Sequence, residues 1–253
     1  MRHLRRIVKI ISLLLWSMLL MLPAAVSLGC CGRWRRIKRG SLWAKRWARG
    51  AAWLTGVRLK VHGNYGDVSG KLLVSNHLGY LDILAQGALF PIRFSPKAEI
   101  RYWPLLGQLV ALNAPVWIDR TSPHKARQYS AEFRATLEHG VSLLVYPEGT
   151  SSDGKHGLLP FKSTPFAALP ENGKIQPMLL FYREEPANEA PGAWFGDISF
   201  PAHVWGVLGL KRINIEVFIM PEMQPLPGET RKELACRVRD AMQKEYYRHE
   251  ELV

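Results

Sequence analysis

Two hydrophobic patterns divide the chain into an apolar N-terminal segment and a longer part with alternating elements. No residue from Ile10 to Gly32 is charged, and this run of 23 residues is long enough to cross a hydrocarbon layer of about 30 Å as a helix. Pro23 interrupts the run. Three interpretations therefore stay open: a single spanning helix, a re-entrant hairpin broken at Pro23, and a cleaved signal peptide that starts with the basic residues Arg2–Arg6.

After Gly63, short apolar runs alternate with amphipathic segments. Strands are predicted over 71–75, 92–97, 115–118, 141–146, 174–182 and 213–220. Helices are predicted over 81–90, 99–111, 124–139, 163–169 and 229–248. In the last helix, Leu234, Val238, Met242 and Tyr246 share one face. This order predicts an α/β fold with a mostly parallel or mixed central sheet covered by helices, preceded by an N-terminal membrane-anchoring helix or hairpin.

The positive charge of the chain lies beside the apolar segment. The net charge is +13, yet residues 1–60 contain 14 Lys and Arg and no acid, and the remaining residues nearly balance. Tryptophan is interleaved with these cations over residues 33–54, and Trp43 and Trp47 fall on one helical face. This composition is typical of a segment at the lipid headgroup level, where basic residues attract anionic lipid. A helix packed on the core through its tryptophans is the alternative, and no nucleic acid partner is expected.

Three cysteines, Cys30, Cys31 and Cys236, form no disulfide framework, which fits a reduced, cytosol-facing compartment. We expect two parts: residues 1–60 as a membrane anchor with a basic, tryptophan-rich interfacial segment, and residues 61–253 as the globular domain. The expected location is the inner (cytoplasmic) membrane, with the globular domain facing the cytosol.

Candidate chemistry begins in Ser75-Asn76-His77-Leu78-Gly79-Tyr80-Leu81-Asp82. His77 follows a predicted buried strand, and Asp82 falls near the start of the next helix, where a carboxylate is favoured in its ionised form. An aspartate folded back onto the imidazole would fix its tautomer and stabilise it once protonated, so that His77 can take a proton from a substrate hydroxyl. A loop histidine and a helix-start aspartate without catalytic roles are an equal alternative. Further along lies Tyr146-Pro147-Glu148-Gly149-Thr150.

These motifs together resemble the glycerolipid acyltransferase family typified by 1-acylglycerol-3-phosphate acyltransferases. The resemblance covers roughly residues 70–180, in order. Its blocks are the His-x4-Asp pair, Phe94-Ser95-Pro96-Lys97-Ala98-Glu99, Val116-Trp117-Ile118-Asp119-Arg120, Glu148-Gly149-Thr150 and Gln176-Pro177-Met178. The resemblance implies transfer of an acyl group from coenzyme A or acyl carrier protein to a lysolipid hydroxyl, most directly that of 1-acylglycerol-3-phosphate, in phospholipid biosynthesis.

The resemblance also implies roles for individual residues. His77 and Asp82 are the expected catalytic base and its orienting acid, and the acyl carrier is a co-substrate, with no cofactor and no metal required. Backbone N–H groups near Gly149, or Lys97, are candidates to stabilise the oxyanion. The expected substrate-binding residues are Asn76, Lys97, Arg120, Glu148, Gly149, Thr150, Ser151 and Lys162. Ordinary ion pairing of Arg120 with Asp119, a solvated Lys162, and a Glu148 that only binds its own turn are the structural alternatives.

One departure concerns the acceptor. Many phosphatidic-acid-forming members have arginine directly after Glu-Gly-Thr, where this chain has Ser151 and Ser152. This form, followed by Leu159-Pro160-Phe161-Lys162-Ser163, resembles lyso-ornithine lipid acyltransferases, whose acceptor lacks the phosphate. That acceptor, or another lysolipid without phosphate, is the alternative substrate.

Other classes of function are less well matched. A serine hydrolase needs a Gly-x-Ser-x-Gly elbow, which is absent, and the remaining histidines show no metal-ligand spacing. A non-catalytic, membrane-anchored lipid-binding module remains as an alternative, and it predicts that His77 and Asp82 can be replaced without phenotype.

Overall fold

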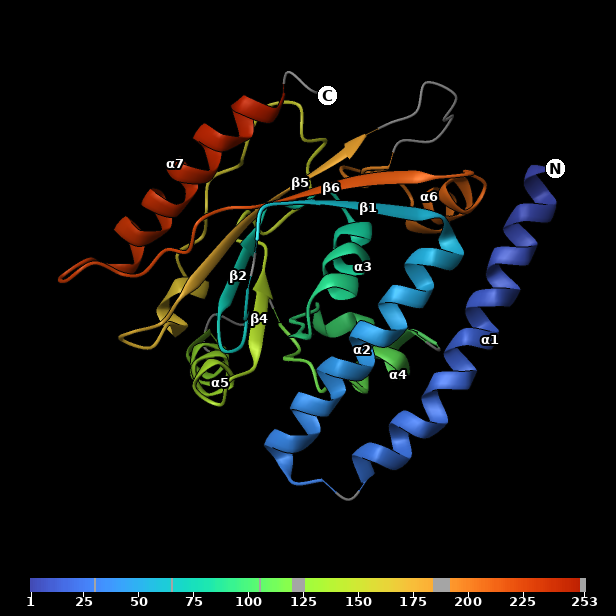
Figure 1. Ribbon diagram of the computed structural model, residues 1–253, viewed down its shortest axis with the longest axis horizontal. Helices are drawn as coiled ribbons and strands as arrows, with labels where there is room; N and C mark the ends of the chain where they lie inside the picture. The colour runs from blue at the N-terminus through green and yellow to red at the C-terminus, as the bar shows by residue number, and fades with distance from the viewer. Residues whose placement is uncertain (30, 65, 105, 120–125, 184–191, 251–253) are drawn as a thin grey trace.

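A six-stranded sheet organises the computed structural model, which describes residues 1–29, 31–64, 66–104, 106–119, 126–183 and 192–250 (Figure 1). The strands are β1 (Val57–His62), β2 (Leu72–Ser75), β3 (Ile92–Arg93), β4 (Ser142–Val145), β5 (Ile175–Arg183) and β6 (Ile213–Ile219). The α-helices are α1 (Arg2–Gly29), α2 (Arg33–Thr55), α3 (Tyr80–Leu89), α4 (Leu106–Ala111), α5 (Ala126–Glu138), α6 (Phe200–Leu208) and α7 (Arg231–Glu250). Two 3-10 turns are η1 (Ala98–Tyr102) and η3 (Pro165–Ala168).

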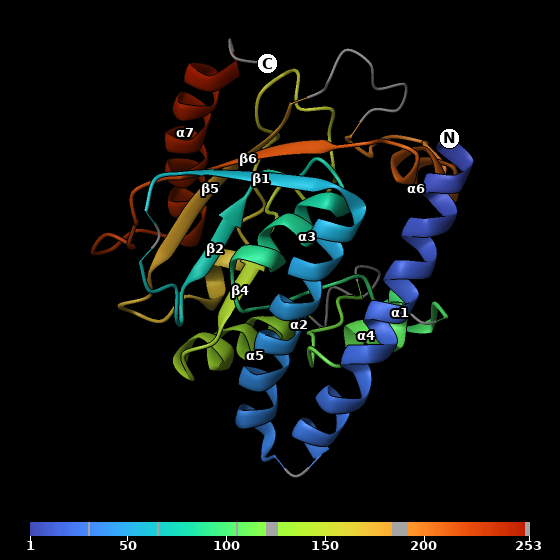
Figure 2. The ribbon, with the colours of Figure 1, turned by 45° about the vertical axis from the view of Figure 1, so that its right-hand side comes forward.

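The sheet is mixed, in the order β1-β6-β5-β2-β4-β3. Only β5 and β6 pair antiparallel, and the other neighbours are parallel. One face packs against α5, η3 and α7, and the other against α2, α3 and α6. Figures 1 and 2 show α7 and the α2–α3 layer on opposite sides of the sheet. The predicted α/β fold with a mixed, helix-covered sheet is confirmed.

Most predicted elements occur near their predicted positions. The predicted apolar face of α7 is buried: Leu234, Val238, Met242 and Tyr246 are each at most 3% exposed. The predicted strand 115–118 is wrong. Val116 and Ile118 donate to the carbonyls of Phe94 and Pro96, but Pro96 has no N–H, and only a single bridge, Lys97 to Ile118, is formed. The predicted helix 99–111 is two pieces, η1 and α4, and the predicted helix 163–169 is the 3-10 turn η3.

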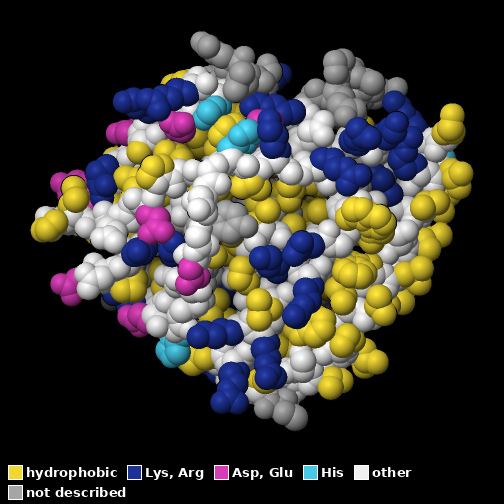
Figure 3. Space-filling model, in the orientation of Figure 1, with side chains coloured by type: hydrophobic (Ala, Val, Ile, Leu, Met, Phe, Trp, Pro, Cys, Tyr) yellow, Lys and Arg dark blue, Asp and Glu magenta, His cyan; other side chains and the backbone are white. Residues whose placement is uncertain are grey.

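Helices α1 and α2 form an antiparallel hairpin along one side of the molecule (Figure 2). The chain turns after Gly29, and α1 continues through Pro23, so the interpretation of a hairpin broken at Pro23 is wrong. Hydrophobic side chains of α1 face outward, among them Leu15, Leu19 and Leu22, which are more than 60% exposed. They form a yellow ridge along the edge where α1 runs (Figure 3). By length and composition, α1 is the one described helix that could cross a membrane.

The opposite side of α1 packs against α2 and is hydrogen-bonded to it. Indole N–H groups donate from Trp16 to the Trp47 carbonyl, from Trp47 to Ser17 Oγ at 3.0 Å, and from Trp43 to Ser27 Oγ at 2.6 Å. Trp43 and Trp47 thus share the face of α2 that contacts α1, as the helical spacing predicts. The division of the chain between residues 60 and 61 stays a prediction, and β1 crosses it as an edge strand of the sheet.

Candidate active site

The loop between β2 and α3 carries the two residues predicted to be catalytic. His77 lies in this loop, and Asp82 is the third residue of α3. His77 Nδ1 is 2.7 Å from Asp82 Oδ2. Because an ionised carboxylate only accepts hydrogen bonds, Nδ1 carries the shared proton and Nε2 keeps the lone pair. The structure therefore brings the predicted base and its orienting acid into direct contact.

Four donors hold the Asp82 carboxylate, which is completely buried. Besides His77, the backbone N–H groups of Leu78 and Gly79 donate to Oδ2 at 2.6 and 2.9 Å, and the Tyr182 hydroxyl donates to Oδ1. The first turn of α3 adds the positive end of the helix dipole. These donors compensate the burial of a carboxylate, and they fix both oxygens relative to the imidazole.

The imidazole of His77 stacks on Tyr146, with ring centroids 4.1 Å apart and an angle of 14° between the planes. The Tyr146 hydroxyl donates to Gln86 Oε1 at 2.7 Å, which fixes the tyrosine in turn. About a fifth of the His77 side chain, 21%, remains exposed. The ring is thus held on two sides while its outer edge stays open to a substrate.

Glu148 joins the second motif to this loop. Its Oε1 accepts from the backbone N–H of His77 at 2.9 Å, and its Oε2 accepts from the backbone N–H of Leu159 at 3.1 Å. Burial raises the pKa of Glu148 to about 7, although these two hydrogen bonds act in the opposite direction. Glu148 therefore ties the backbone of His77 to that of Leu159, and the alternative in which it binds only its own turn is wrong.

The turn after Glu148 lies beside the histidine. Gly149 has a left-handed φ of +74° and donates its N–H to the Tyr146 carbonyl at 3.0 Å, while the Ser152 N–H donates to the His77 carbonyl at 3.0 Å. Thr150 is exposed and Ser151 is half-buried between these two points. The Lys162 amine packs on this turn, since a Cβ at position 149 would lie 2.4 Å from Lys162 Nζ. Five predicted residues, Glu148 to Ser151 and Lys162, are thus gathered around the His77 loop.

One other predicted cation among the described residues, Lys97, is not joined to this cluster by a hydrogen bond. Lys97 is exposed, precedes η1 and forms its backbone bridge to Ile118. No hydrogen bond within the described part of the chain links the Lys97 amine to His77 or Asp82. Arg120 lies outside the described residues, so its role stays a prediction from the sequence.

The side chain of Asn76, directly after β2, continues the hydrogen bonding to β5 beyond the end of the strand. Its Nδ2 donates to the Leu180 carbonyl at 2.9 Å, and its Oδ1 accepts from the Leu180 N–H at 2.7 Å. The side chain is buried, with 2% exposure. Because both polar atoms of the amide bind the β5 backbone, Asn76 positions the His77 loop, and direct substrate contact by Asn76 stays an untested prediction.

Three residues of the site were missed at the level of sequence: Tyr146, Tyr182 and Gln86. Tyr146 is the first residue of the Tyr-Pro-Glu-Gly-Thr motif, and its place at the end of a buried strand, two residues before that motif's glutamate, was a usable signal. Tyr182 and Gln86 lie in apolar runs that predict only a buried strand and a buried helix. Their contacts depend on how the strands are ordered, which no local pattern reveals.

Comparisons with known proteins find similarity to acyltransferases. The family model named Acyltransferase matches residues 58–179. The 1-acyl-sn-glycerol-3-phosphate acyltransferase of Neisseria gonorrhoeae is 29% identical over 69% of this chain and 68% of its own length. The lyso-ornithine lipid O-acyltransferase of Rhodobacter capsulatus is 35% identical over 72% of this chain and 68% of its own length.

A solved structure shares the fold over nearly the whole chain. The crystal structure of the 1-acyl-sn-glycerophosphate acyltransferase of Thermotoga maritima superposes with a TM-score of 0.68 at 18% identity, covering 98% of this chain and 97% of that one. With the sequence relatives and the family model, the conclusion is direct: this chain belongs to the acyltransferase family.

Proposed function

We propose that this enzyme transfers a fatty acyl group from a thioester to the hydroxyl of 1-acylglycerol-3-phosphate, forming phosphatidic acid. The observation that carries the proposal is the 2.7 Å contact between His77 Nδ1 and the buried Asp82 carboxylate. This contact leaves Nε2 as a base at a partly exposed ring edge. The name of the Neisseria relative supports the choice of acceptor.

The reaction proceeds by direct attack. Nε2 of His77 takes the proton of the acceptor hydroxyl as its oxygen bonds to the thioester carbonyl carbon. The carbonyl oxygen becomes an oxyanion, and Asp82 stabilises the imidazolium. The tetrahedral intermediate collapses with cleavage of the carbon–sulfur bond, and the thiolate takes the proton from Nε2. The acyl carrier, coenzyme A or acyl carrier protein, is consumed as a co-substrate, and the scheme uses no cofactor.

The oxyanion needs donors close to Nε2. Because Ser152 is hydrogen-bonded to the His77 carbonyl, the preceding N–H groups of Thr150 and Ser151 lie on the turn next to the histidine. They are better placed for this role than Gly149, whose N–H donates to Tyr146. Lys162, packed on the same turn, supports binding of an anionic headgroup, and Arg120 is the second cation that the sequence proposes for this purpose.

A second acceptor, lyso-ornithine lipid, is favoured by one specific feature. Ser151 and Ser152 stand where many phosphatidic-acid-forming relatives have arginine, and the Rhodobacter relative named for this lipid is 35% identical. An acceptor without phosphate requires less positive charge in the site. The two candidates therefore differ in what Lys162 contributes to binding.

We also propose that the α1–α2 hairpin holds the enzyme on the cytosolic face of the inner membrane, with α1 lying in the interface. The Arg5 guanidinium donates to the Gly209 carbonyl at 2.7 Å, and Lys9 donates to the Leu210 carbonyl at 2.8 Å. Helix α1 thus contacts the rest of the protein from Arg5 to Ser27. A spanning α1 would draw the basic helix α2 into the hydrocarbon layer, whereas an interfacial α1 keeps its exposed apolar ridge in lipid and α2 in the headgroups.

The test is acyl transfer by the purified full chain with a panel of lysolipids and both acyl carriers. We expect transfer to 1-acylglycerol-3-phosphate, its loss in His77→Ala, and unchanged rates in His156→Ala, the matched replacement of an exposed histidine. Preference for lyso-ornithine lipid would select the second acceptor. A folded His77→Ala protein with full activity would refute the mechanism, and lipid binding without transfer by the wild-type chain would favour a non-catalytic module.

A further inference from the structure

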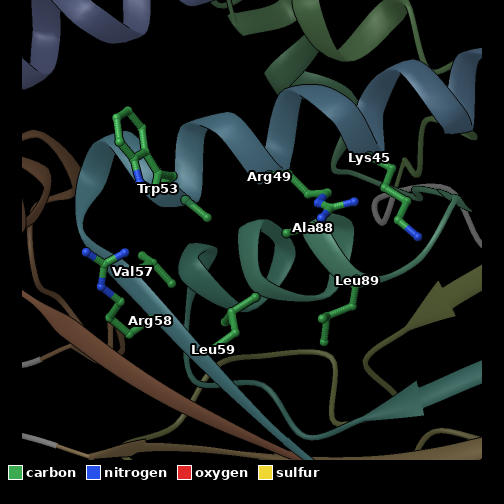
Figure 4. Close-up of a pocket in the computed structure, with 9 residues that line it drawn as sticks. Lys45, Arg49, Trp53, Val57, Arg58, Leu59, Ala88 and Leu89 are labelled. Atoms are coloured by element: carbon green, nitrogen blue, oxygen red, sulfur yellow. The ribbon is translucent and has the colours of Figure 1, made fainter.

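A groove of about 450 Å³ lies between α2, the C-terminal end of α3 and the start of β1 (Figure 4). This volume falls in the range of about 300–1,000 Å³ that is usual for small-molecule sites. The lining residues from α2 are Lys45, Arg49, Ala52 and Trp53, and those from the other two elements are Val57, Arg58, Leu59, Ala88 and Leu89. The mechanism proposed above uses none of them.

The groove carries three positive charges, from Lys45, Arg49 and Arg58, and no negative charge. Residues 1–66 contain no acid, and no ion pair or hydrogen bond within the described chain engages these three side chains. Lys45 and Arg49 are four residues apart on α2, where like charges repel. Burial lowers the pKa of Lys45, and the charge of Arg49 lowers it further. An anion in the groove would relieve this repulsion.

The rest of the lining is apolar and includes an exposed tryptophan. Trp53 is 68% exposed, and Leu59 and Leu89 line other parts of the groove. Lys45, Arg49 and Trp53 recur at helical spacing, so they share one face of α2, different from the face on which Trp43 and Trp47 contact α1. A tryptophan beside cations is suited to the boundary between headgroups and acyl chains.

The groove is separate from the reaction site. Ala88 lies six residues after Asp82 on α3, which corresponds to a rise of about 9 Å along the helix axis. A phosphate near Ala88 is therefore too far from His77 to belong to the reacting acceptor, whose phosphate is only a few bonds from its hydroxyl. A phosphate bound in this groove would therefore belong to a molecule other than the reacting acceptor.

We propose that this groove binds the phosphate headgroup of an anionic membrane phospholipid, which acts as a docking lipid and not as a substrate. The three unpaired cations hold the phosphate, and Trp53 and the leucines contact the glycerol and upper acyl chains. Figure 3 shows Lys and Arg side chains beside the apolar ridge of α1, so a protein that rests on this ridge brings basic side chains close to the headgroups. The proposal depends on membrane attachment and not on the identity of the acceptor.

The test measures binding of the full chain to vesicles of phosphatidylcholine alone and of phosphatidylcholine mixed with phosphatidylglycerol. The test variant is Lys45→Ala/Arg49→Ala/Arg58→Ala. The control variant, Arg35→Ala/Arg36→Ala/Lys38→Ala, removes the same residue types from exposed positions elsewhere on α2. Each cation near an anionic surface contributes about fivefold to binding, so diffuse attraction alone predicts equal losses of about 100-fold in both variants. We expect the test variant to lose at least about tenfold more affinity than the control, on the anionic vesicles only.

Three outcomes would overturn the proposal. The test and control variants could lose the same affinity for anionic vesicles, or the test variant could lose as much affinity for vesicles of phosphatidylcholine alone as for anionic vesicles. In the third outcome, excess coenzyme A or acyl carrier protein abolishes the extra affinity of the wild-type protein for anionic vesicles. The last outcome would assign the groove to the acyl donor. Acyl transfer to detergent-dispersed lysolipid serves as a separate measurement. We expect it to stay within about twofold of wild type in the test variant, which also shows that the variant is folded. If the proposed reaction itself is wrong, the wild-type protein shows no acyl transfer, and this result is independent of the vesicle-binding result.

Discussion

The substitution Asp82→Asn tests the His77–Asp82 pair with little change in shape. In the wild-type protein, Oδ2 accepts from three donors and Oδ1 accepts from the Tyr182 hydroxyl. An asparagine can keep its carbonyl oxygen at the Oδ2 position and direct its NH₂ group to the tyrosine, because a hydroxyl can accept as well as donate. The hydrogen bonds and the imidazole tautomer can therefore be retained, while the negative charge is lost.

The expected loss of activity follows from this charge. A unit negative charge about 4 Å from the imidazolium, at an effective dielectric constant of about 20, contributes about 4 kcal/mol. If this energy is present only when His77 is protonated in the transition state, kcat falls by about 10³-fold, with little change in KM. The loss of stability should be smaller, roughly 1–2 kcal/mol, because the donors keep their partners.

The assay is release of free thiol from an acyl thioester by the purified enzyme, with urea unfolding of each variant measured in parallel. The matched control is Tyr182→Phe, which removes one donor to Asp82 without changing its charge, so we expect less than a tenfold loss of kcat. If folded Asp82→Asn keeps more than a tenth of wild-type kcat, the carboxylate does not stabilise an imidazolium, and the assignment of His77 as a base aided by Asp82 is refuted.

Three further predictions concern the residues around the pair. Because the pKa of Glu148 is raised from 4.5 to about 7, the folded protein holds a proton that the unfolded chain releases, so this group lowers stability as the pH rises from about 4.5 to 7. Glu148→Gln should reduce the change in unfolding free energy between pH 5 and pH 8 by at most roughly 3 kcal/mol, and an unchanged pH dependence in urea titrations would contradict this. Asn76→Ala should lower the free energy of unfolding by roughly 2–5 kcal/mol, because it leaves the Leu180 N–H and carbonyl without their Asn76 partners. A variant that unfolds at the same temperature as the wild-type protein would refute the role of Asn76 in holding its loop on β5. Gly149→Ala should lower the free energy of unfolding by about 1–2 kcal/mol, because position 149 has a left-handed φ, and the new Cβ should displace Lys162. We expect KM to rise more for a phosphate-bearing lysolipid than for lyso-ornithine lipid. Equal changes in the two KM values would argue against a role of Lys162 in headgroup binding.

Elements with strong local patterns were predictable from the sequence. The buried run before His77 forms β2, and the amphipathic run near the C-terminus forms α7. β1 was not predicted from the sequence. Arg58 and Lys60 are exposed on it, and in the sequence these two cations continue the basic N-terminal segment, which did not indicate a strand. Pairing with β6 on one edge is what makes it a strand, and that information lies more than 150 residues away.

The site shows the same division between local and tertiary information. The contact of His77 with Asp82 was predictable, because both residues lie within one loop and the first turn of one helix. The Tyr182 contact was not, since 100 residues separate it from Asp82. It requires β5 to lie beside β2, and several orders of the strands would satisfy the same hydrophobic pattern.

The strand order explains why this site forms at the end of β2. β2 lies between β4 and β5 and is parallel to both, so the carboxyl ends of all three strands meet at one edge of the sheet. β4 leads into Tyr146 and Glu148, which hold the ring and the backbone N–H of His77. Near its carboxyl end, β5 provides Leu180 for the Asn76 amide and Tyr182 for the Asp82 carboxylate. The histidine is thus positioned from both neighbouring strands, and a change of register in either one would misplace it even if the loop sequence were intact.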